Sequence, residues 1–215
     1  MSTIHIHSHE ARHDQSSGGI NAMAASATLH CLTGCAIGEI AGLMIGTALG
    51  MSVGLTITLS VSLAFLFGYA LSTLPLLKSG LSVGAALAVV LAADTLSIVV
   101  MEVVDNTVMA TIPGAMDAGL ANPVFWFGMM LALLAAFVAA YPVNRYLLGR
   151  GKGHALTHSY HGDARPAEGG RRFIPSFATA TLATAIGAFL LGGLLASLAA
   201  DGDPAGEERV HAVGR

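Results

Sequence analysis

Charged residues are scarce in this sequence: Asp, Glu, Lys and Arg make up only 11% of its 215 residues, whereas 54% are hydrophobic. A water-soluble domain of this composition would lack a polar surface, so that class of protein is excluded. The hydrophobic residues also occur in long blocks, each close to the ~20 residues that a helix needs to cross a bilayer. The composition therefore predicts an all-α, polytopic membrane protein.

Cysteine is almost absent as well, because only Cys31 and Cys35 occur. Two cysteines four residues apart on a helix do not resemble the disulfide framework of a secreted protein. Their Cα atoms would also lie near the upper distance limit for a disulfide. We therefore expect free thiols or metal-bound thiolates. No phosphate loop, hydrolase triad, nucleic-acid-binding face or cleavable signal peptide is recognisable, which favours binding or transport over catalysis.

Five apolar blocks are predicted to span the membrane: Met23–Thr47, Val53–Leu74 (closed by Pro75), Val83–Ile112, Val124–Leu148 and Phe173–Ala200. Basic residues are concentrated after the second block, at Lys78, and after the fourth, and such connections normally face the cytoplasm. With five spans, this bias places the amino terminus in the cytoplasm and the acidic carboxy-terminal tail outside.

The same pattern divides the chain into regions. Residues 1–22 are predicted to be a disordered, His-rich tail, and 23–148 a four-helix membrane core. Residues 149–172 form a basic cytoplasmic linker, 173–200 the fifth transmembrane helix and 201–215 the tail. Histidines in the first tail and the linker are consistent with metal capture, but solvated, flexible segments are the simpler interpretation; they are His5, His7, His9, His13, His154, His158 and His161.

Glycine recurs at every fourth position of the first block, at Gly34, Gly38, Gly42, Gly46 and Gly50. Small residues at this spacing let another helix approach closely in a membrane. This row predicts tight packing of the first helix, and the glycine-rich faces also predict a homo-oligomer.

Ionisable side chains lie inside two of the predicted spans, and such groups by default mark a functional site. In the first span, His30, Cys31 and Cys35 are expected in the inner half and Glu39 near the middle. In the third span, about one third of the helix circumference carries a stripe of acids and thioethers. That stripe consists of Asp94, Met101, Glu102, Asp105 and Met109. If the two spans touch, the stripes form a ladder across the membrane.

The leading interpretation of this ladder is the binding and translocation of a transition-metal ion. Thiolate, imidazole and thioether ligands suit Cu(I), and imidazole, thiolate and carboxylate also suit Zn(II) or Fe(II). Copper is therefore the first choice, with zinc or iron as alternatives. The expected metal ligands are His30, Cys31, Cys35, Glu39 and Asp94, and the expected outer pathway is Met101, Glu102, Asp105 and Met109.

Two other classes of function remain open. The cysteines could belong to a membrane redox enzyme or redox subunit that uses thiols, haem or quinone. Haem is the weaker option, because no span besides the first contains a histidine that could pair with His30. Alternatively, the polar groups conduct protons or small ions, or form a buried network without any metal.

Several segments resemble a family of small bacterial membrane proteins catalogued as a domain of unknown function. The similar region runs roughly from Thr28 to His154. Its motifs here are HCLTGCAIGE at His30–Glu39, FLFGYAL at Phe65–Leu71, ADTLS at Ala93–Ser97 and NPVFWF…YPVNRYLL at Asn122–Leu148. The resemblance supports the choice of the five expected ligands and implies no substrate. We expect a multi-pass protein of the bacterial inner membrane whose partners are the lipid bilayer, a metal ion and further copies of itself.

Overall fold

Five α-helices make up the part of the chain that the structure describes, and this part contains no β-strand. The computed structural model describes residues 7–150, 173–175 and 177–202, with side chains described from Gly19 onward. The helices are α1 (His7–Ala48), α2 (Val53–Lys78), α3 (Val83–Thr111), α4 (Pro123–Gly149) and α6 (Thr179–Asp201). All five are long and apolar enough to cross a bilayer, α1 over Gly19–Ala48. The predicted all-α, five-span fold is confirmed.

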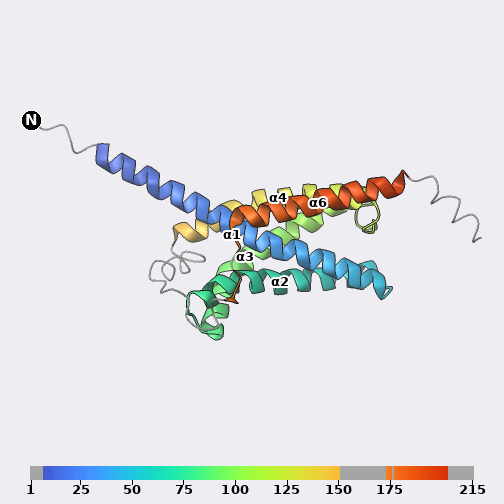
Figure 1. Cartoon of the computed structure of the whole chain (residues 1–215), viewed down its shortest axis with the longest axis horizontal. Helices are drawn as coiled ribbons and strands as arrows, with labels where there is room; N and C mark the ends of the chain where they lie inside the picture. Colours follow the sequence, from blue (N-terminus) through green and yellow to red (C-terminus); the bar gives the residue numbers. More distant parts are fainter. Residues whose placement is uncertain (1–6, 151–172, 176, 203–215) are drawn as a thin grey trace, which may run out of the picture.

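Three helix ends differ from the expected bounds by more than one residue. Residues 1–22 were expected to be disordered, whereas α1 begins at His7 and projects beyond the other helices (Figure 1). Adding turns to an existing helix costs little because nucleation is complete, and no proline interrupts this segment.

Pro75 was expected to close the second span, yet α2 continues to Lys78. The N–H of Ser79 still donates to the Pro75 carbonyl, since a proline near a helix end removes only its own donor.

The last helix begins later than expected, at Thr179 instead of Phe173. Pro175 disfavours a helical backbone for the residue before it, which delays the helix start. The predicted linker with His154, His158 and His161, and most of the predicted tail 201–215, lie outside the described residues.

The glycine row of α1 packs against α2 within the same chain. A Cβ at Gly34 would overlap the backbone of Gly68, and one at Gly38 would overlap the backbone of Ala64. The helices can therefore approach this closely only because no side chain stands between them. The tight packing predicted for α1 is confirmed, and Gly34 and Gly38 lie in its contact with α2.

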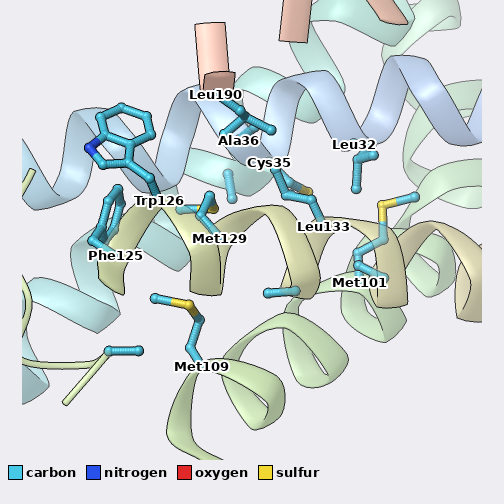
Figure 2. Packing of buried hydrophobic residues seen from close by; sticks show 14 of the residues in the cluster. Leu32, Cys35, Ala36, Met101, Met109, Phe125, Trp126, Met129, Leu133 and Leu190 are labelled. Atoms are coloured by element: carbon cyan, nitrogen blue, oxygen red, sulfur yellow. The ribbon is translucent and has the colours of Figure 1, made fainter. Parts of the chain in front are cut away.

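The hydrophobic core lies where α1, α3, α4 and α6 meet (Figure 2). Trp126 of α4 is central to it, with 5% of its surface exposed. Its indole N–H donates to the Leu120 carbonyl at 2.7 Å and thereby holds the connection between α3 and α4. Its ring also makes an edge contact with Phe189 of α6, at 5.6 Å between centroids. Trp126 therefore fixes both the α3–α4 connection and α6.

Large apolar side chains cover the outside of the bundle. Examples from four helices are Leu66, Val103, Leu134 and Leu195, each with well over half of its surface exposed. An apolar surface of this extent is stable in contact with lipid and not with water. The structure thus has the inverted polarity of a membrane protein, with acids buried and aliphatic groups outside.

Candidate functional site

The polar stripes of α1 and α3 face each other inside the bundle. Cys31, Cys35 and Glu39 lie one turn apart along α1, and their neighbours on α3 follow in the same direction along the chain. The first and third spans are in contact, which the formation of a ladder required. The ladder of buried acids and thiols therefore exists as a three-dimensional arrangement.

The first level of the ladder joins Cys31 to Asp94, and both residues are fully buried. The thiol of Cys31 interacts with the Asp94 carboxyl and lies 3.9 Å from the Ser72 hydroxyl of α2. Next to it, the Asn144 amide of α4 donates to the Thr28 hydroxyl at 2.8 Å. Four helices thus contribute polar groups to this level.

The second and third levels contain only acids and one thiol. Cys35 has Glu102 and Glu39 as its charged neighbours, and Glu39 lies beside Asp105. Exposure of these four side chains is between 1% and 8%. In the described part of the chain, no hydroxyl, amide or cationic donor bonds to either oxygen of Glu39 or Glu102. Among the described residues, these carboxyls therefore have one another and Cys35 as neighbours, and no Lys or Arg.

A cavity of about 290 Å³ opens beyond the third level. Glu39 and Asp105 line it, and Glu39 lies nine residues from the end of α1, which corresponds to about 13 Å of helix. The connection between α1 and α2 and the connection between α3 and α4 line its other end. Four methionines also line it: Met51, Met109, Met116 and Met129. The ladder thus leads to one end of the bundle, which we call the cavity end; the opposite end, with Lys78 and Arg150, is the basic end.

The other expected site residues are placed less favourably for a metal. His30 is half-buried, and its Nδ1 lies 2.8 Å from the Ser26 carbonyl of its own helix. Met101 is buried in the apolar core, 1% exposed. In the described part of the chain, no three side chains of His, Cys, Asp or Glu form a group that could hold a metal ion. The ladder brings Cys31, Cys35, Glu39 and Asp94 into one series without gathering them and His30 at a single centre.

Several polar residues near the ladder were not among the expected site residues. Thr28, Ser72, Ser97 and Asn144 are all buried near the first level. Single hydroxyl and amide groups in helices often bond to their own backbone, so their sequence positions alone say little. Asp117, at the rim of the cavity, was also missed because it lies in a connection and belongs to no helical stripe.

The fold and this site together define a multi-pass, all-helical membrane protein with a buried acid–thiol ladder. The chain belongs to the family described as "Domain of unknown function (DUF4396)", which matches residues 21–153. That segment contains α1 from Asn21 onward and all of α2, α3 and α4, and hence the whole ladder and the cavity. Comparisons with curated proteins and with solved structures found no match.

The motifs that carried the resemblance have defined places in the structure. HCLTGCAIGE supplies the α1 side of the ladder, and ADTLS supplies Asp94 and Ser97 on α3. FLFGYAL contains Gly68, which allows the close approach of α1 and α2. NPVFWF begins α4, where the Asn122 side chain accepts from the Val124 N–H at 2.9 Å. Each motif thus either builds the ladder or positions the helices around it.

Proposed function

We propose that this protein binds a transition-metal ion within the bundle and carries it across the bacterial inner membrane, with Cu(I) as the preferred ion. The observation that carries the proposal is that the thiols of α1 face acids of α3 at successive levels of the ladder. Cys31 faces Asp94, and Cys35 faces Glu102, at successive levels. A series of sites one helical turn apart, and not a single deep centre, is what passage of an ion requires, since each step must release the ion again.

The charge balance of the ladder supports a cation as the substrate. Glu39, Glu102 and Asp105 are buried together, and no described Lys or Arg pairs with them. An uncompensated charge away from water costs several kcal/mol. The three carboxyls must therefore hold protons, or a bound cation must neutralise them. In a transport cycle, the carboxyls would hold protons when the site is empty and release them when the metal ion binds.

The thiols favour a soft or borderline ion over Mg²⁺ or Ca²⁺. Thiolate ligands select Cu(I), Zn(II) or Fe(II), whereas sites for hard cations consist of oxygen atoms alone. Cys31 and Cys35 are both free and almost completely buried, at 0% and 1% exposure. In this proposal Cys31, Cys35, Glu39 and Asp94 are ligands, with Glu102 and Asp105 as further steps.

Elemental analysis by mass spectrometry tests the proposal on protein purified without a histidine tag and without chelator. We expect about one metal ion per chain to be lost in Cys31→Ser/Cys35→Ser, because both thiolates are removed. The matched control is Ala36→Ser, which places a hydroxyl in the same helix at a buried position outside the ladder. The control should retain the metal and the metal flux into proteoliposomes. Equal metal content and flux in the wild type and the double variant would refute the assignment.

Proton passage is a second candidate, and a specific observation favours it. The carboxyls of Glu39 and Asp105 are neighbours, yet no three ligand side chains in the described residues are gathered as a preformed metal centre. A row of acids alone is sufficient to pass protons. The same proteoliposomes separate the two functions: a pH-dependent proton flux that survives Cys31→Ser/Cys35→Ser would replace metal transport with proton conduction.

A further inference from the structure

The cavity beyond Glu39 combines two kinds of ligand that the ladder does not combine. Its lining contains the thioethers of Met109 and Met129, from α3 and α4, and the carboxyls of Glu39 and Asp105. Of the residues that the structure describes, no Lys, Arg or His lines it. Its polar side chains therefore offer oxygen and its methionines offer sulfur, without a competing positive charge.

Glu39 is the group that marks this cavity as a binding site. It is 92% buried, since 8% of its surface is exposed, and it lines the cavity. Among the described residues, no hydroxyl, amide or cationic group donates to either of its oxygens, and the Asp105 carboxyl is its side-chain neighbour. A carboxyl–carboxyl contact with Asp105 is a hydrogen bond only when one of the two carries a proton. Apart from this contact with Asp105, the Glu39 carboxyl has no described donor, and it lines a space that is large enough for an ion.

Two methionines add sulfur ligands to the carboxyl oxygens of the cavity. Met109 and Met129 are 6% and 3% exposed. Figure 2 shows Met109 reaching from α3 toward α4, and its sulfur would lie 3.0 Å from a Cβ placed at Gly128, the residue before Met129. Thioether sulfur is a soft, neutral ligand that binds Cu(I) or Ag(I) and binds Mg²⁺ or Ca²⁺ poorly. Packing alone explains a buried methionine, but it does not explain a buried carboxyl in the same cavity.

We propose that this cavity is a capture site for a soft monovalent cation, in which the thioethers of Met109 and Met129 select the ion and the Glu39 carboxyl balances its charge. The inference rests on the proposed transport function, because it places the first or last binding site of the transported metal ion at the cavity end. It adds a site separate from the thiols and narrows the substrate to Cu(I), with Ag(I) as its chemical analogue.

Silver binding in the Cys31→Ser/Cys35→Ser background isolates the cavity from the ladder thiols. Full-length protein is titrated with Ag(I) in equilibrium dialysis, and we expect Met109→Leu/Met129→Leu to lose about one bound ion per chain. Leucine and methionine have similar volumes, so the fold should tolerate the exchange. The matched control is Met130→Leu, which changes the next residue of α4 without changing the cavity lining and should retain the ion.

A second readout identifies the residues directly. Bound Ag(I) should protect Met109 and Met129 from oxidation to sulfoxide, measured by peptide mass spectrometry, while Met130 reacts equally with and without the ion. Equal silver binding in Met109→Leu/Met129→Leu and Met130→Leu would overturn the capture site. Failure of the transport proposal gives another result: metal flux would be the same with and without the two cysteines, whether or not the cavity binds silver.

Discussion

At the level of single residues, one hydrogen bond joins α1 to α4, the first and last helices of the four-helix core. The Asn144 amide of α4 donates to the Thr28 hydroxyl of α1, and that hydroxyl donates in turn to the Ala24 carbonyl. Both side chains are buried, so water cannot replace either partner. Thr28 precedes Cys31 by less than one turn, and the bond therefore fixes the rotation of α1 at the first level of the ladder.

Replacing Thr28 by Val should destabilise the protein by about 1 kcal/mol, since the Asn144 amide loses its acceptor inside the bundle. The matched control is Thr33→Val on the same helix. The Thr33 hydroxyl donates only to the Leu29 carbonyl, so its loss should change stability much less. Thermal unfolding in detergent, followed by the fluorescence of the single Trp126, measures both variants. Equal midpoints for the two would show that the interhelical bond contributes nothing.

Among the elements, α6 packs on the family core through apolar side chains, and an aromatic contact and a polar contact add to this packing. A Cβ at Gly193 would lie 2.5 Å from ring atoms of Trp126, so the absence of a side chain there permits the contact. At the other end of α6, the hydroxyls of Thr179 and Ser26 lie 2.7 Å apart. Because α6 lies outside the matched family segment, these contacts fix it onto the helices that carry the site.

The adjacent glycines of α6 provide a controlled test of this attachment. Gly193→Ala should destabilise the docking of α6 by about 1–3 kcal/mol, because the Trp126 ring is held by Leu120 and cannot yield freely. Gly192→Ala faces open space and should have little effect. A red shift of Trp126 emission in Gly193→Ala alone would report the displaced helix. Identical spectra and stabilities for the two variants would contradict the packing described for α6.

At the scale of the whole molecule, the five spans place the cavity end and the basic end on opposite faces of the membrane. The connection from α1 to α2 and the connection from α3 to α4 both lie at the cavity end. The distribution of Lys and Arg predicts that the basic end faces the cytoplasm. Soft cations would then enter or leave the cavity from the outer side.

Cysteine labelling of intact cells tests this orientation. We expect a membrane-impermeant maleimide to label Ser52→Cys, at the cavity end, without permeabilisation. It should label Ser82→Cys, at the basic end, only after the membrane is opened. Both positions are exposed, and the native Cys31 and Cys35 are buried, so they provide a low background. The reverse labelling pattern would place the cavity in the cytoplasm.

Much of the fold could be predicted because its signals are local. The apolar blocks show where the helices cross the bilayer, and the glycine row shows that α1 packs closely against another helix. Which helix fills that row could not be predicted, and the partner is α2 of the same chain. Spacing on one helix defines a face but does not identify what covers it.

The number of spans, and the acids and thiols inside them, could be predicted from the amino-acid sequence. These properties depend on composition and on helical periodicity, which a linear chain already contains. Three pairings needed the packed helices: Cys31 with Asp94, Asn144 with Thr28 across 116 positions, and methionines from two helices with Glu39 in one cavity. Such pairings depend on the rotation and distance of packed helices, which residues far apart in the chain set together.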